Sequence, residues 1–233
     1  MIHSINHVLL RVGVRVELLV CLALLVGCAN HKAPEPNTDA ADALRPLLNS
    51  ERIRQRFGSY GIEVLRDTSQ LRISDLYSTD CDKKRTTRTH ALVLYTNPIS
   101  DLIAAEHKQI KSGASLGAVF KQSGWQITKH HRYFGRVDVS THQAFLQTRM
   151  RMSETAELAV HIYELQVHKG QSSLPYAVIA ELHHPDYLRL SDLKTLYPHE
   201  YHQGTTLNPQ TQQILRQLEE SLIVALTGIG EPQ

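Results

Sequence analysis

Residues 156–185 read AELAVHIYELQVHKGQSSLPYAVIAELHHP, and this stretch decides the fold. Two runs rich in apolar and β-branched residues, 156–168 and 174–183, flank the polar segment Lys169–Ser173, which contains a glycine. This pattern predicts a β-hairpin. Pro185 ends the second arm, because proline has no N–H to donate to a β-ladder. Strands joined by turns this short pair antiparallel, which argues against alternating βαβ units.

Similar signals continue on both sides of this hairpin. Short apolar runs between turn residues predict four more strands, over residues 61–66, 70–78, 89–96 and 125–134. Capping residues and glycine stops predict helices over residues 50–57, 100–112, 115–123 and 191–197. Residues 142–152 show no clear pattern.

The last helix is predicted from its start signal and its periodicity. Asn208 can cap a helix whose first residue is Pro209, and apolar residues from Ile214 to Leu226 recur at helical spacing. We therefore expect an α+β fold with a mostly antiparallel sheet of consecutive hairpins. The helices are expected to pack on one face of the sheet, and the C-terminal helix to be amphipathic.

One spacing indicates an internal duplication. Leu71 to Pro98 and Leu158 to Pro185 each span 27 residues, and each contains a strand, a polar loop, a second strand and a proline. A duplication would relate the regions around 61–112 and 148–199 with an offset of 87. Few side chains are identical between the two regions, so a single domain without a repeat is favoured.

Composition and charge exclude several classes of protein. Of the 233 residues, 42% are apolar and 21% are charged, which is typical of a chain that folds around a core. The formal charge is only +2, from 25 basic and 23 acidic residues. This balance excludes a nucleic-acid binder whose affinity depends on a strongly positive surface.

The N-terminal region has the pattern of a secretory signal. Its apolar run, Leu18–Val26, has nine residues, whereas a membrane span needs about 20. Arg11 and Arg15 precede the run. A basic segment followed by a short apolar run is typical of a signal peptide rather than of a transmembrane helix.

The run ends in Leu25-Val26-Gly27-Cys28, and this segment resembles the lipobox of bacterial lipoproteins with a type II signal peptide. The resemblance implies that the signal peptide, residues 1–27, is cut between Gly27 and Cys28. It also implies that Cys28 then carries a diacylglyceryl group on its thiol and an acyl chain, such as palmitate, on its amino group. Residue 29 is Ala rather than Asp, which in this family implies the periplasmic face of the outer membrane. An ordinary signal peptide with a chance cysteine is the alternative.

The resemblance covers the signal region alone, and we recognise no family for the rest of the chain. We expect residues 28–49 to be a lipidated, flexible tether, since residues 29–42 contain two prolines and lack periodicity. Residues 50–233 are expected to form the single α+β domain. Cys21 leaves with the signal peptide and Cys28 carries lipid, so Cys81 is the one cysteine that remains and an intramolecular disulfide is excluded.

The segment Gly113-Ala114-Ser115-Leu116-Gly117 matches the G-x-S-x-G pattern of a nucleophile elbow. In α/β-hydrolases, that serine stands on a sharp turn between a strand and a helix. Here a helix is predicted before Gly113, so a helix-capping serine between two glycines explains the same residues. A membrane-tethered serine hydrolase using Ser115 is therefore an alternative function and not the leading one.

Histidine is frequent, with nine of the 14 residues at or after position 130. The densest groups are His183-His184-Pro-Asp186 and His199-Glu-Tyr-His202, and imidazoles with a carboxylate suit zinc or copper. The H-E-x-x-H motif is absent from the sequence, and Pro198 argues against a regular helix through the second group. A metal-binding periplasmic domain using His183, His184, His199 and His202 is the second alternative. Structural or exposed histidines are favoured, and no cofactor is expected.

The leading hypothesis is an envelope lipoprotein whose domain binds a partner or supports envelope structure, without catalysis. Its expected partners are membrane lipid, through the acylated Cys28, and an envelope protein or glycan; nucleic acid is not expected. The sequence contains no feature that specifies a substrate.

Overall fold

The computed structural model describes residues 47–154, 157–204 and 206–227. The predicted signal peptide (1–27), the lipobox (25–28) and the tether up to residue 46 lie outside the described residues. Within the described ranges, no helix is both long enough and apolar enough to cross a membrane.

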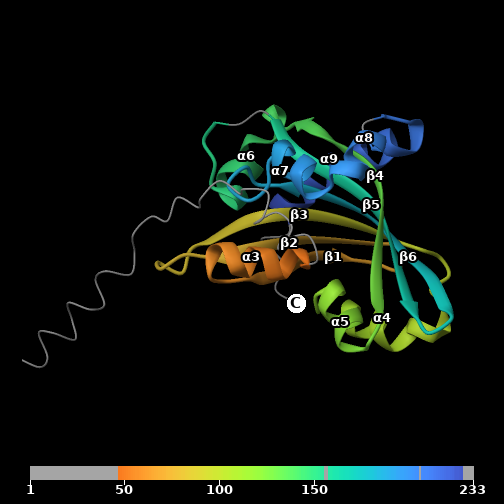
Figure 1. Cartoon of the computed structure of the whole chain (residues 1–233). Coiled ribbons are helices and arrows are strands. Elements are labelled where there is room, and N and C mark those ends of the chain that lie inside the picture. Colours follow the sequence, from red (N-terminus) through yellow and green to blue (C-terminus); the bar gives the residue numbers. More distant parts are fainter. Residues whose placement is uncertain (1–46, 155–156, 205, 228–233) are drawn as a thin grey trace, which may run out of the picture. The chain divides into compact units, whose positions relative to one another are not determined.

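Six strands form one antiparallel sheet in the order β1-β2-β3-β6-β5-β4 (Figure 1). The strands are β1 (Gly61–Asp67), β2 (Leu71–Thr79), β3 (Arg85–Tyr95), β4 (Gln126–Asp138), β5 (Glu157–Lys169) and β6 (Ser172–His183). Two meanders, β1-β2-β3 and β4-β5-β6, join where β3 pairs with β6. The predicted α+β class and the hairpin of β5 and β6 are therefore confirmed.

The helices lie before, between and after these strands. They are α3 (Asn49–Phe57), the 3-10 turn η1 (Asp101–Ile103), α4 (Ala104–Lys111), α5 (Leu116–Gln122), the 3-10 turn η2 (Ser140–His142), α6 (Gln143–Phe145), the π-helical turn η3 (Leu146–Met150), α7 (Leu190–Leu196), α8 (Pro198–Gln203) and α9 (Pro209–Thr227). Gly58 ends α3 with a φ of 74°, a left-handed conformation that glycine adopts without strain.

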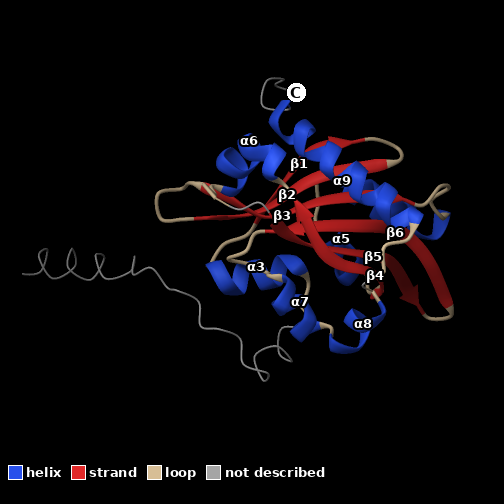
Figure 2. Cartoon of the chain, turned by 90° about the horizontal axis from the view of Figure 1, so that it is seen from above, coloured by secondary structure: helices blue, strands red, loops and turns tan. Residues whose placement is uncertain are grey.

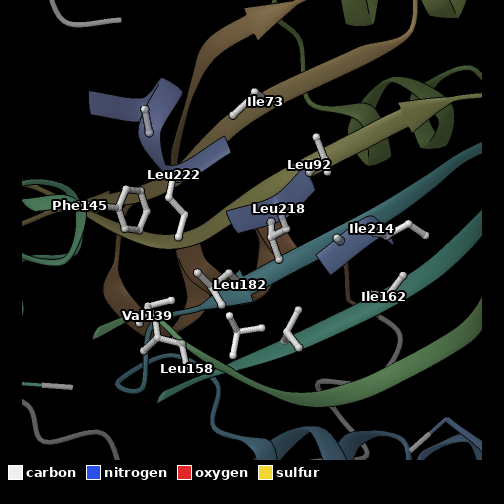
Figure 3. Close-up of a cluster of buried hydrophobic side chains, with 14 of the residues drawn as sticks. Ile73, Leu92, Val139, Phe145, Leu158, Ile162, Leu182, Ile214, Leu218 and Leu222 are labelled. Carbon is white, nitrogen blue, oxygen red and sulfur yellow. The ribbon is translucent and has the colours of Figure 1, made fainter. Parts of the chain in front are cut away.

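One face of the sheet, which we call the α9 face, is covered by α9, α6 and η3 (Figure 2). Apolar side chains of the central strands point to this face, among them Leu92, Ile162 and Leu182. Leu218 and Leu222 of α9 lie directly over them (Figure 3). Burial of this amphipathic helix closes the first core.

The opposite face, which we call the α3 face, carries two separate apolar clusters. At one end, α4 and α5 pack on Tyr163, Leu165 and Ile179. At the other end, α3 packs with α7 and α8, which lie beside it in Figure 2. The helices therefore cover both faces rather than the one face expected, because β5 and β6 carry apolar side chains on both faces. Both strands are buried along most of their length.

The edge strand β4 contains an irregularity that aligns its side chains. His131 pairs with Tyr163, whereas Phe134 pairs with His161, so Arg132 is an extra residue in the ladder. This bulge places both His131 and Phe134 on the α3 face although their numbers differ by three. In the first half of the strand, alternate residues from Gln126 to Arg132 are exposed.

In an internal duplication, residues related by the offset of 87 would point to the same face of the sheet. It relates Leu71 and Leu158, which both point to the α9 face. In the third strand of each meander it relates Leu92, on the α9 face, to Ile179, on the α3 face. A single offset therefore does not keep equivalent side chains on one side of the sheet.

The core on the α9 face yields a stability prediction with a matched control on the same helix. Leu222 is fully buried and Ile223 is 54% exposed. We expect Leu222→Ala to lower the free energy of unfolding by about 2–5 kcal/mol, because it leaves a cavity. Ile223→Ala should cost less than about 0.5 kcal/mol. Urea denaturation of the two variants measures this difference, and equal losses would contradict the packing of α9.

Candidate functional site

Ser115 lies between two helices and not after a strand. It occupies the N-cap position of α5. The preceding helix, α4, ends at Lys111, and Gly113, with a φ of 102°, makes the turn between the two helices. Its hydroxyl faces the phenol of Tyr60. In the described part of the chain, Ser115 makes no hydrogen bond to a histidine. The strand–turn–helix context of a nucleophile elbow is therefore absent at this position.

The four predicted metal ligands do not come together. His183 lies on the α3 face, where its Nδ1 is 3.1 Å from Thr89 Oγ1. His184 Nε2 donates to the carbonyl of Met150 at 3.1 Å, and its Nδ1 accepts from the Asp186 N–H at 3.0 Å. His199 and His202 are exposed on α8.

The expectation that Pro198 would prevent a helix through His199 and His202 was wrong. Pro198 is the first residue of α8, where its missing N–H is not needed.

A buried polar cluster forms around His183 at the centre of the α3 face. We call it the α3-face cluster, and its members are Asn49, Thr89, His161, Glu181 and His183. His161 of β5 lies opposite Glu181 of β6. Asn49 Nδ2 donates to Glu181 Oε1 at 3.0 Å, which ties the start of α3 to the sheet.

The charge states in this cluster follow from burial and neighbours. Burial lowers the pKa of His183 to about 4 and lowers that of His161 well below its ordinary value, so both imidazoles are neutral at pH 7. Burial alone would raise the pKa of Glu181, but the charges of Lys129 and Arg52 help to bring it below its ordinary value. Glu181 is therefore ionised.

A cavity of about 80 Å³ lies beside the cluster, between the two apolar clusters of the α3 face. Its walls come from all six strands and from the first residues of α3 and α5, including Leu48 and Ser115. A larger hollow of about 550 Å³ adjoins it, lined by β4, Trp125 and Tyr197. Leu48, Ile127 and Lys129 line both spaces, so they lie where the two meet.

Positive charge exceeds negative charge around these spaces. Arg72, 2% exposed, lines the cavity and donates to the carbonyls of Ile110 and Gly113 at 2.6 and 3.4 Å. Arg52, 4% exposed, donates to Tyr197 Oη at 3.2 Å, and its Nε and Nη1 have no hydrogen-bond partner in the described part of the chain. Lys129 Nζ lies 4.3 Å from the centre of the Tyr163 ring.

Among the described residues, none of these three cations forms an ion pair with a carboxylate. Of the described residues that line the cavity, Glu181 is the one that is acidic. An arrangement with this excess of positive charge is suited to an anionic group.

The α9 face contains a second polar group whose geometry resembles a Ser-His-Asp triad. His90 Nδ1 is 2.7 Å from Asp75 Oδ1, and His90 Nε2 is 2.8 Å from Ser221 Oγ. All three residues are at most 2% exposed and lie under α9. The Ser221 hydroxyl also lies 2.5 Å from the carbonyl of Leu218. A substrate has no access to this serine, so the group joins α9 to the sheet.

Sequence reasoning missed His161 and Glu181 because the hairpin register hides their pairing. Lys169 pairs with Ser172, but a bulge near Leu165 and Gln166 shifts the register before His161 is reached. Alternation along β6 does place Glu181 and His183 on one face, and that signal was available in the sequence. Comparison with known proteins adds no name to this site, since no family model and no curated protein matches the chain.

The burial of Ser221 and the setting of Ser115 predict that neither serine is a reactive nucleophile. We expect the folded protein to remain unlabelled by a fluorophosphonate, as measured by the mass of the intact protein. Labelling that Ser115→Ala removes would revive the hydrolase alternative. Labelling that Ser221→Ala removes would contradict the burial of the triad-like group.

Proposed function

We propose that this protein is a lipid-anchored envelope protein whose α+β domain binds a small anionic amphiphile in the cavity of the α3 face and the larger hollow that adjoins it, without catalysis. The anchor is proposed from the lipobox Leu25-Val26-Gly27-Cys28 and the short apolar run before it. By the family resemblance, the domain faces the periplasm from the outer membrane.

The observation that carries the binding proposal is the excess of buried positive charge beside an apolar cavity. Burying a guanidinium without a counter-charge is costly, and carbonyl oxygens compensate Arg72 in part. An anionic group near Lys129 would supply the missing charge. The apolar side chains of Leu48, Ile127 and Leu165 would contact the rest of such a ligand.

The settings of Ser115 and Ser221 support binding over hydrolysis at these two serines. The G-x-S-x-G serine faces a phenol, and the triad-like group is buried under α9. An envelope protein or a glycan remains the alternative partner, which would contact the outer surface rather than the cavity.

Metabolic labelling tests the anchor. Cells that express the full chain and grow with labelled palmitate should incorporate label into the wild type, whereas Cys28→Ser should abolish it. Cys81→Ser is the matched control and should keep the label, because Cys81 lies in the exposed turn between β2 and β3. An unlabelled wild type would contradict the lipoprotein proposal and would leave the binding proposal intact.

Energy transfer from Trp125 tests the cavity. Trp125 is the one tryptophan of the chain and lines the larger hollow. We expect the anionic apolar dye anilinonaphthalene sulfonate to accept energy from it in the full-length protein in detergent, and variants of single residues separate dye bound at the site from dye in the attached micelle. Lys129→Met should weaken this binding about tenfold, through loss of one charge-assisted hydrogen bond.

Arg136→Met is the matched control for this experiment. Arg136 lies on the same strand but is exposed and contacts Glu157. Binding should be unchanged in this variant. Equal weakening in the two variants, or no energy transfer in the wild type, would contradict the proposed site.

A further inference from the structure

Three buried side chains on adjacent strands place metal-ligand atoms close together. His161 projects from β5, and Glu181 and His183 project from β6 to the same face. One ligand atom from each residue lies within 4.8 Å of the others. The three side chains are at most 5% exposed, so they are shielded from bulk solvent.

An unpartnered nitrogen provides an independent indication. His183 Nε2 is buried and has no hydrogen-bond partner among the residues that the structure describes. It faces Glu181 Oε2 at 3.9 Å, which is too long for a hydrogen bond. An orphaned buried nitrogen is costly unless something binds it, and a cation between nitrogen and carboxylate would do so.

The surroundings of His183 match those of a metal-ligating histidine. Its Nδ1 is held by the hydroxyl of Thr89 at 3.1 Å, which orients the ring and leaves Nε2 toward Glu181. Ligating histidines commonly bond a second protein group through their other nitrogen in this way. Asn49 orients the carboxylate of Glu181 in a similar way, by donating a hydrogen bond to Oε1.

We propose that His161, Glu181 and His183 bind one divalent transition-metal ion, with zinc as the best match. Two imidazoles and one carboxylate favour zinc, copper or iron over calcium and magnesium, which prefer oxygen ligands. Three protein ligands leave at least one coordination position open. Glu181 also lines the cavity, which gives the ion a path of entry.

The neighbouring charges have to be compatible with a cation. Lys129 lies over the Tyr163 ring and Arg52 bonds to Tyr197, so neither pairs directly with Glu181. His131 Nδ1 lies 2.7 Å from His161 Nε2, and this contact fixes the orientation of the His161 ring. Lys129 and Arg52 favour an anion at the open position, which would offset the charge of the ion.

Zinc stoichiometry of the full-length protein tests the site. The protein is stripped with a chelator, incubated with zinc alone and passed through a desalting column, and its metal content is measured by mass spectrometry. We expect one equivalent per chain in the wild type. We also expect cobalt to give the visible absorption of a site with nitrogen ligands and low coordination number.

Two variants remove single ligands with little change in shape. His183→Asn keeps a polar atom near Thr89 but removes Nε2, and Glu181→Gln keeps the volume but removes the charge. Each should reduce bound zinc to less than about a tenth of the wild-type level, while thermal unfolding stays cooperative. If one of the two fails to fold, the other still decides the outcome.

A control variant and a positioning variant complete the experiment. His199→Gln with His202→Gln removes two exposed histidines and should leave the stoichiometry at one. Thr89→Val should keep the cobalt spectrum but weaken zinc about 10- to 100-fold, because it releases the ring of His183. A wild type that retains no zinc, or ligand variants that retain one equivalent, would overturn the proposal.

Discussion

The antiparallel pairing of β3 with β6 is the constraint on which the rest of the domain depends. It runs from Thr89 opposite His183 to Tyr95 opposite Ala177 and joins the two meanders into one sheet. Because side chains alternate along a strand, this one register determines what each face receives. It places Leu92 and Ala180 under α9 and places Thr89 beside His183 on the other side.

The two polar groups in the interior depend on this register in different ways. On the α9 face, Asp75, His90 and Ser221 form a chain of short contacts that joins the last helix to β2 and β3. On the α3 face, His183 and Arg52 retain nitrogen atoms without hydrogen-bond partners among residues 47–154, 157–204 and 206–227, and a cavity lies next to them. A satisfied network serves packing, whereas an unsatisfied one beside a cavity is suited to binding. Of the two faces, the α3 face is therefore the one suited to binding a ligand.

Local patterns predicted most of the secondary structure. The hairpin of β5 and β6 followed from apolar runs around Gly170, and α9 followed from Pro209 and the stripe that begins at Ile214. The coverage of both faces was missed, although nearly continuous apolar runs in β5 indicate burial on both sides. Residues 142–152 lacked a pattern because they form two short turns and a π-helix rather than one regular element.

The candidate site was harder to predict, because it is made by contacts between residues distant in sequence. His183 was identified from its neighbours in the chain, but His161 and Glu181 meet through a register that two-residue periodicity cannot supply. The histidine pair at 199 and 202 has suitable spacing but lies on an exposed helix. Ser115 has a motif whose required strand is replaced by α4. In each case the deciding information was tertiary.

The irregular edge strand β4 would have a consequence for the membrane-anchored protein proposed above. Copies confined to one plane meet far more often than copies free in three dimensions, and unpaired strand edges invite association between sheets. The exposed side of β4 carries His130, Arg132 and Arg136, and its ladder is broken by the bulge near Arg132. An irregular ladder disfavours pairing between two such edges. The domain is thereby suited to crowding in two dimensions without forming continuous sheets.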